Sequence, residues 1–218
     1  MNQYIDLTNL KAYATIDDIT KLCQLAKKYH TASVCVNPYY IPLAKDLLSD
    51  SNVLVCTVIG FPLGANTIES KVFEACDSIE KGADEIDMVI NIGALKDKEY
   101  DYVKKEIEEV RDSIDGKTLK VIIETCYLTD EEIMKMTEIC NETYVNFIKT
   151  STGYGTRGVN LHDIDIINKY KNEILEIKAS GGIKTKEEAL ELIDNGVTRL
   201  GTSSIDILKE ELWHFLKN

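Results

Sequence analysis

Two lysines and a carboxylate lie at or near the ends of apolar runs, and a lysine in such a position could form an imine with a carbonyl substrate. Lys149 closes the apolar run VNFIK, Lys178 closes ILEIK, and Asp87 lies within EIDMVI. A lysine amine attacks a carbonyl only when neutral, and a second cation nearby favours loss of its proton. A positioned carboxylate can then transfer protons. The pattern indicates Schiff-base chemistry. The alternative is a structural ion-pair network, or lysines that extend outward to solvent.

Two segments rich in glycine and hydroxyl side chains could bind an anion. ASGGIKTKEE (179–188) and LGTSSIDIL (200–208) each resemble a strand end, a turn and a helix start. Glycine lets backbone amides approach an anion, and a helix N-terminus adds partial positive charge. The two segments together favour a phosphate-binding site. Either one alone could equally be an ordinary turn between a strand and a helix, where Gly and Ser are common.

The elements that would position these residues alternate along the whole chain. Apolar side chains recur at helical spacing in 98–114, at Val103, Ile107, Val110 and Ile114. Between such amphipathic stretches lie short β-rich runs, which predict strands near residues 4–7, 32–36, 53–59, 85–90, 119–124, 145–149, 174–178 and 198–201. Strands that alternate with helices predict a parallel sheet.

Eight such units in 218 residues predict an α/β protein, a single (β/α)8 barrel over residues 1–218. The run VLVCTVIG (53–60) has no polar alternation, as expected for a strand covered on both faces. A doubly wound open sheet is the alternative, but no GxGxxG follows the first expected strand. Helix starts are predicted at three capping patterns, Thr15 with Asp18, Thr129 with Glu132, and Thr185 with Glu188.

In a barrel, function lies at the C-terminal ends of the strands, and the loops after the last two strands often bind phosphate. The side chains expected at these ends are Asp6, Thr8, Cys35, Asn37, Asp87, Asn91, Glu124, Lys149 and Lys178. Alternation also points Lys120, Glu85 and Glu176 inward, where charges are costly unless they are paired. So many charges converging on one small space favour a functional site.

Composition limits the partners and the compartment. A formal net charge of −12 disfavours nucleic acid and anionic membranes, which leaves a small molecule as the expected partner. The six cysteines form no CxxC pair, so neither a zinc site nor a redox motif is expected, and a reducing cytoplasm is the expected location. The N-terminus lacks the apolar region of a signal peptide, and no run is long enough to span a membrane.

The segment VNFIKTSTGYG (145–155) resembles the Schiff-base segment of deoxyribose-phosphate aldolases. Nearly the whole chain shares the resemblance, through ASVCVNPYYIPLA (32–44), ADEIDMVINIGAL (83–95), VIIETCYL (121–128) and KASGGIKT (178–185). The resemblance implies reversible, metal-free cleavage of 2-deoxy-D-ribose 5-phosphate to acetaldehyde and D-glyceraldehyde 3-phosphate, in deoxyribonucleoside catabolism. It implies no cofactor.

The resemblance also implies roles. Lys149 would form the imine, Lys178 would favour its neutral amine and help move protons, and Asp87 would transfer protons. The phosphate would be held by Gly153, Gly181, Gly182, Gly201, Ser203 and Ser204. Further candidates for substrate contact, for which packing or strand-end hydrogen bonding is the alternative, are Asp6, Thr8, Cys35, Glu124 and Thr152.

Three features depart from the family pattern. Residues 5–8 read IDLT where many members have IDHT, Tyr154 stands where some have a lysine, and WHFLKN (213–218) lacks the C-terminal tyrosine of others. One phosphate contact and any tail-dependent proton transfer are therefore unassigned. No catalytic role is expected for the histidines, His30, His162 and His214.

Other functions remain as alternatives. Another barrel aldolase is one, and a sugar-phosphate isomerase, which would need a catalytic carboxylate but no imine-forming lysine, is another. A sensor that binds a sugar phosphate would keep the anion-binding segments and lose a catalytic residue. Barrels of this kind often pair, so a homodimer is compatible with the sequence.

Overall fold

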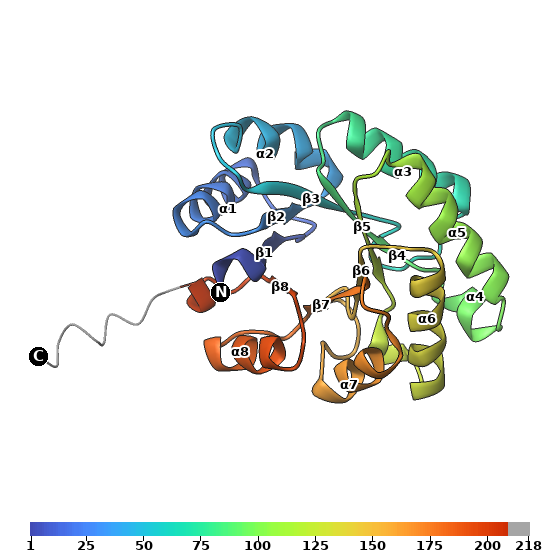
Figure 1. The fold of residues 1–218 in the computed structure, drawn as a ribbon. Coiled ribbons are helices and arrows are strands. Elements are labelled where there is room, and N and C mark those ends of the chain that lie inside the picture. The colour runs from blue at the N-terminus through green and yellow to red at the C-terminus, as the bar shows by residue number, and fades with distance from the viewer. Residues whose placement is uncertain (209–218) are drawn as a thin grey trace, which may run out of the picture.

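The computed structural model describes residues 1–208, and eight parallel strands close into a barrel in sequence order (Figure 1). The last strand pairs with the first, which leaves no open edge. The strands are β1 (Ile5–Asn9), β2 (Ser33–Val36), β3 (Leu54–Ile59), β4 (Glu85–Val89), β5 (Thr118–Ile122), β6 (Phe147–Lys149), β7 (Glu176–Ser180) and β8 (Arg199–Thr202). Each lies within two residues of its predicted bounds, and the predicted (β/α)8 barrel is confirmed.

Helices cover the outside of the barrel (Figure 1). They are α1 (Ile16–Tyr29), α2 (Ile41–Leu47), α3 (Ile68–Glu80), α4 (Ile92–Lys96), α5 (Tyr100–Ser113), α6 (Asp130–Glu142), α7 (Leu161–Tyr170) and α8 (Lys186–Asp194). Short 3-10 turns lie at Asn2–Tyr4, Pro38–Tyr40, Thr125–Tyr127 and Asp206–Leu208. The stretch predicted as helical at 98–114 forms α5. The helix expected after β8 falls largely on residues outside the described part of the chain.

Local sequence sets where several helices begin. At Thr15, Thr129 and Thr185 the threonine hydroxyl accepts from the backbone N–H three residues later, and the acidic side chain there accepts from the threonine N–H. These reciprocal bonds satisfy amides that a helix start otherwise leaves unpaired. All three predicted capping patterns are therefore confirmed.

The main apolar core lies between the barrel and its helices, whereas the barrel interior carries charge. Outward-facing strand residues such as Val34, Ile86 and Ile148 belong to that core. Inside the barrel, a small apolar cluster consists of Leu10, Cys35, Cys56 and Val58, with Phe61 against it. Beside it are buried Asp6, Glu85, Asp87, Lys120 and Lys178.

Lys120 and Glu85 face inward as strand alternation predicts, but Glu176 is exposed at the first position of β7. The first residue of a strand lies at the N-terminal end of the barrel, where even an inward-facing side chain can extend into water. Among residues 1–208, no helix is long and apolar enough to cross a membrane. The predicted single domain over 1–218 includes residues 209–218, which lie outside the described part of the chain.

Candidate active site

The carboxylate of Asp87 joins four side chains inside the barrel. Its Oδ2 accepts from Lys149 Nζ at 2.8 Å and from Lys178 Nζ at 2.7 Å. Its Oδ1 accepts from Lys120 Nζ at 3.0 Å and from the Cys56 thiol at 3.2 Å. Strand register explains this convergence, because Asp87 pairs with Lys120 across β4 and β5, and Lys149 pairs with Lys178 across β6 and β7.

A second set of carboxylates extends this arrangement around the barrel. Asp6 contacts Lys178 Nζ at 2.5 Å through Oδ2 and Arg199 at 2.7 Å through Oδ1. Glu85 contacts Arg199 at 3.1 Å and Lys120 at 2.6 Å. We call the whole set the inner-barrel network: Asp6, Glu85, Asp87, Lys120, Lys149, Lys178 and Arg199. Four cationic side chains thus share three carboxylates.

The network keeps Asp87 and Lys178 charged despite burial. Burial alone would raise the pKa of Asp87, but the ammonium groups of Lys120, Lys149 and Lys178 together hold it well below its usual range. Burial would lower the pKa of Lys178, but Asp6 and Asp87 raise it above its ordinary value. In the substrate-free protein Lys178 is therefore a cation next to the candidate nucleophile.

Lys149 lies at the mouth end of the network. It is the last residue of β6, its exposed fraction is 3%, and it lines a pocket of about 320 Å³. Predicted site residues gather around this pocket, which is also lined by Thr8, Thr152, Gly153, Gly181, Gly182, Gly201, Ser203 and Ser204. Those that do not line it are Asp6, Cys35, Asp87, Glu124 and Lys178.

Two residues differ from their predicted places at strand ends. Lys178 is the third residue of β7, because that strand continues to Ser180, so it lies below the mouth. Glu124 follows β5 by two residues in a left-handed conformation with φ of 52°. Its buried carboxylate accepts from the backbone N–H and the hydroxyl of Thr152. These hydrogen bonds connect the loop after β5 to the loop after β6 and so position the residues that follow Lys149.

The loops after β7 and β8 offer fewer free amides than the sequence predicts. The N–H groups of Lys184 and Thr185 donate to Glu188 at 2.8 and 3.0 Å, and the Ser204 N–H donates to the Thr202 hydroxyl at 2.9 Å. The start of α8 is thus occupied by its own cap. The free amides at this pocket lie in its glycine turns instead.

Gly153 and Gly182 have φ of 87° and 82°, and a Cβ on either would meet nothing within 4 Å. Their amides donate to no acceptor among residues 1–208. Lysines that the sequence interpretation did not assign, Lys11 and Lys184, also line the pocket, and neither forms an ion pair with any described residue. Unpaired cations beside open glycine turns suit a phosphate.

Tyr154 ties the loop after β6 to the loop after β1. Its hydroxyl donates to the Leu10 carbonyl at 2.7 Å, and its ring contacts Phe61 edge-on at 5.5 Å between centroids. The residue therefore closes one side of the mouth and supplies no cation there.

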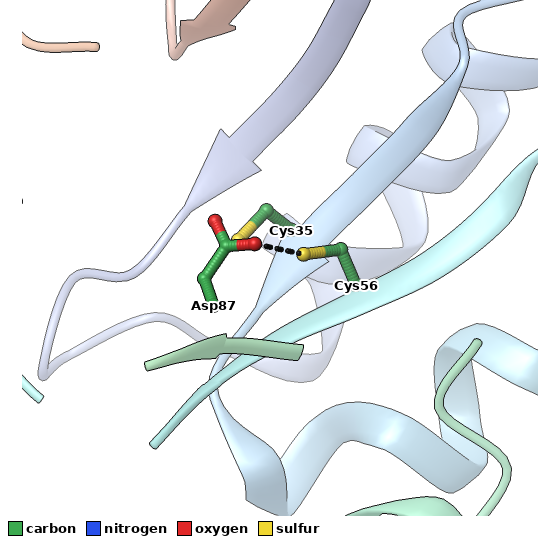
Figure 2. A group of neighbouring side chains, drawn as sticks. All are labelled: Cys35, Cys56 and Asp87. Carbon is green, nitrogen blue, oxygen red and sulfur yellow. Dashed lines mark hydrogen bonds between the residues drawn. The ribbon is translucent and has the colours of Figure 1, made fainter. Parts of the chain in front are cut away.

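Two groups of side chains have the spacing of metal ligands. The sulfurs of Cys35 and Cys56 and a carboxylate oxygen of Asp87 lie within 4.8 Å of one another (Figure 2), and Asp6, Cys56 and Glu85 form a similar group. The carboxylates of both groups already accept from lysine or arginine. A divalent cation would have to displace those cations, so both groups favour ion pairing over metal binding.

Sequence reasoning missed Arg199 and Cys56 as members of the site. Arg199 begins β8 within an unremarkable TRL, and nothing local indicates that it reaches Asp6 and Glu85. Among the histidines, His30 is the C-cap of α1 and His162 contacts exposed Asp130 at 3.0 Å, and neither lines the pocket. His214 lies outside the described residues.

Comparison with known proteins agrees with this geometry. Residues 1–205 match the model of the DeoC/LacD family of aldolases. The deoxyribose-phosphate aldolase of Finegoldia magna is 55% identical over 94% of this chain and 96% of its own length. That of Thermococcus kodakarensis is 55% identical over 93% of this chain and 92% of its own.

Solved structures show the same likeness. The aldolase QR15 superimposes with a TM-score of 0.94 at 40% identity, covering 100% of this chain and 98% of that one. A putative deoxyribose-phosphate aldolase from Coccidioides immitis gives 0.92 at 36% identity, covering 95% and 83%. The family match and these identities agree with the barrel and with its buried lysine–carboxylate network below the pocket. The chain belongs to the DeoC/LacD aldolase family.

Proposed function

We propose that this chain is a deoxyribose-phosphate aldolase that cleaves 2-deoxy-D-ribose 5-phosphate to acetaldehyde and D-glyceraldehyde 3-phosphate through an imine on Lys149. The observation that carries the proposal is the place of Lys149. It opens onto the pocket while its Nζ shares one oxygen of Asp87 with Lys178.

The inner-barrel network holds one more cationic side chain than it has carboxylates. With four cations and three carboxylates in the inner-barrel network, loss of one proton leaves equal numbers of opposite charges. The pKa of Lys120, Lys178 and Arg199 is raised by the carboxylates around them, so these three keep their protons. Lys149 has a single carboxylate contact and faces the pocket, which makes it the member that can react.

The reaction then follows from elementary chemistry. The Lys149 amine adds to the substrate aldehyde and water leaves, giving a protonated imine. The imine accepts the electron pair of the breaking C–C bond as a base removes the proton of the adjacent hydroxyl, and an enamine remains. We assign these proton transfers to Asp87 and Lys178. Oδ2 of Asp87 accepts a hydrogen bond from Lys149 and another from Lys178, so both groups lie next to the reacting amine.

We assign the phosphate end of the substrate to the glycine turns. The open amides of Gly153 and Gly182, with Lys184 beside them on the pocket wall, match a dianion. Gly201, Ser203 and Ser204 complete that wall. The net charge of −12 makes this local positive site necessary, because an acidic surface repels a free phosphate ester.

Reductive trapping tests the imine. Borohydride added with acetaldehyde should alkylate Lys149, and trypsin should then leave residues 136–157 as one peptide with an uncleaved Lys149. Lys149→Met should give no adduct, whereas the exposed control Lys98→Met should give the wild-type result. An adduct on another lysine would refute the role of Lys149, and the absence of any adduct would leave an isomerase or a binding protein.

Ser204→Asp tests the phosphate end. The Ser204 hydroxyl donates to the Lys184 carbonyl at 3.1 Å, so a carboxylate there would stand beside the proposed phosphate. Cleavage of deoxyribose 5-phosphate should weaken mainly through KM, while the slow reaction of unphosphorylated deoxyribose should change little. Equal losses on both substrates would place the phosphate elsewhere.

We further propose that residues 1–218 form one catalytic domain that works in the cytoplasm as a homodimer. Reduced thiols at all six cysteines support that compartment. A related structure, the aldolase from Aeropyrum pernix, is described as tetrameric at 28% identity, so assembly occurs in similar proteins. Sedimentation equilibrium measures the mass in solution and tests the dimer.

A further inference from the structure

Two thiols face each other beneath the active site. Cys35 and Cys56 are register partners on β2 and β3, and both are fully buried among inward-facing side chains. Their sulfurs and one oxygen of Asp87 lie within 4.8 Å of one another, with the Cys56 thiol directed at Asp87 (Figure 2). Adjacent strands run about 4.8 Å apart, which is within the Cα separation that a disulfide spans.

The two thiols have unequal reactivity. A hydrogen bond with Cys56 lowers the pKa of Cys35, with Lys178 and Lys149 acting in the same direction, whereas burial raises the pKa of Cys56. A thiolate is the nucleophile toward peroxides, so Cys35 is the thiol that would react first. Of the remaining cysteines, Cys23 and Cys140 have pKa values raised by burial.

We propose that Cys35 and Cys56 form a disulfide when the protein meets a small peroxide, and that this oxidation reversibly inhibits the enzyme. The Cys35 thiolate attacks one oxygen of hydrogen peroxide, the O–O bond breaks, and the departing hydroxide takes a proton as water. The sulfenic acid at Cys35 is then attacked by the Cys56 sulfur, which loses its proton and releases a second water as the S–S bond forms. Two thiols are oxidised and one peroxide is reduced.

The catalytic pocket would bring the oxidant to Lys149, from which it must pass inward to the thiols, because neither Cys35 nor Cys56 lines the pocket. A sugar phosphate must reach Lys149, whose Nζ is 2.8 Å from the carboxylate of Asp87 that both sulfurs approach. Hydrogen peroxide is smaller than that substrate and carries no charge for the acidic surface to repel.

Inhibition follows from the lost proton on Cys56. In the reduced protein, Oδ1 of Asp87 accepts from Cys56 and Lys120, which leaves Oδ2 for Lys149 and Lys178. A disulfide has no S–H to donate, so Oδ1 of Asp87 loses one of its two donors and Asp87 keeps three of its four hydrogen-bond partners. We expect kcat to fall about fivefold, which is the size of one hydrogen bond.

Peptide mapping after peroxide treatment tests the proposal without depending on aldolase activity. The protein is oxidised, its free thiols are blocked under denaturing conditions, and trypsin is added without reductant. Cys35 and Cys56 fall on separate peptides, residues 29–45 and 46–71, each with no other cysteine. We expect these two peptides to be linked, and dithiothreitol to restore both the separate peptides and the activity.

Three variants sharpen the result. Cys56→Ser should give no link, and its Cys35 sulfenic acid should be trapped by dimedone. Cys35→Ser should also give no link. The exposed control Cys76→Ser should form the link as wild type does. Recovery of Cys35 and Cys56 as free thiols under conditions that oxidise Cys76 would overturn the proposal, and so would sulfinic acid at Cys35 of wild type without a link.

Discussion

The inside of the barrel and the contact between α3 and α5 both bury oppositely charged side chains against each other. At the second place Lys71 and Glu106 form one ion pair at 2.5 Å, and both side chains are fully buried. Burial lowers the pKa of Lys71 and raises that of Glu106, so each shifts toward its neutral form. In the inner-barrel network the shifts of Asp87 and Lys178 have the opposite sign.

The difference shows what keeps a buried group charged. Lys71 has one carboxylate within ion-pair distance, and one partner does not offset its loss of hydration. Lys178 has two such carboxylates, and Asp87 has three ammonium groups. Shared partners stabilise each charge more than burial destabilises it, so the substrate-free site holds a buried cation at Lys178 and a buried anion at Asp87.

The largest effect is expected from Asp87→Asn. This change leaves three buried ammonium groups without their shared carboxylate, which should lower the free energy of unfolding by about 3–5 kcal/mol. Removing the proton-transfer group should also lower kcat by about 10²–10⁴. Urea unfolding and steady-state kinetics measure the two effects.

The matched change in the other region is Glu106→Gln. Lys71, whose pKa burial already lowers, can give up its proton, so the expected cost is only about 1–3 kcal/mol. The activity of the folded protein should stay within about twofold of wild type, because no catalytic group is touched. Equal stability losses in the two variants would show that the number of partners does not matter.

Lys178→Leu should move the pH dependence of imine formation. Removal of a neighbouring cation favours the protonated amine at Lys149, so the acid limb of borohydride trapping should shift upward by about one to three pH units. Lys178→Arg keeps the charge but cannot shuttle a proton, so it should preserve trapping better than turnover. Circular dichroism checks that both variants fold.

Lys71→Leu is the control for that experiment. It removes a buried cation that lies outside the barrel, so the acid limb should stay where it is in wild type. An acid limb that also stays unchanged in Lys178→Leu would mean that burial, and not the second cation, tunes Lys149.

Lowering the pH should change the stability contributions of the two regions in opposite directions. The lowered pKa of Asp6 reflects Lys178, Lys120 and Arg199 outweighing burial. Its stabilisation is complete above the ordinary value of 3.8 and is lost as pH falls through the folded-state value. The cost of Asp6→Asn, measured by urea unfolding, should therefore shrink as pH falls below 3.8.

For Glu106 the pKa is raised, so the folded state keeps a proton that the unfolded state has released above 4.5. The stability that this proton confers is lost as pH rises through the folded-state value. The cost of Glu106→Gln should therefore shrink as pH rises above 4.5. A cost that grows with pH would show that the ion pair with Lys71 outweighs burial after all.

The smallest effect is expected when both partners of the outer pair are replaced. Lys71→Met with Glu106→Leu removes two buried charges together, and such exchanges are commonly neutral or stabilising by about 1–4 kcal/mol. The Asn91 N–H, which donates to Glu106 at 2.6 Å, loses its acceptor and reduces the gain. Thermal unfolding measures the sum. A large destabilisation would mean that this pair stabilises the fold as strongly as the network does.

The sequence by itself determined the barrel, the strand positions and the helix caps. Apolar periodicity and capping are local, because burial of one face and satisfaction of the first amides depend on residues only a few positions apart. Resemblance to a known family, together with strand position, also singled out Asp87, Lys149 and Lys178. Their roles remain predictions.

Only the tertiary structure decided which charges meet. Barrel closure brings Arg199 to Asp6 across 193 positions, and strand register places Cys56 and Lys120 on the same oxygen of Asp87. The sign of each pKa shift depends on the number of such partners, which no local pattern encodes. For the same reason the sequence could not show that the amide of Ser204 is occupied by Thr202, since that depends on loop conformation.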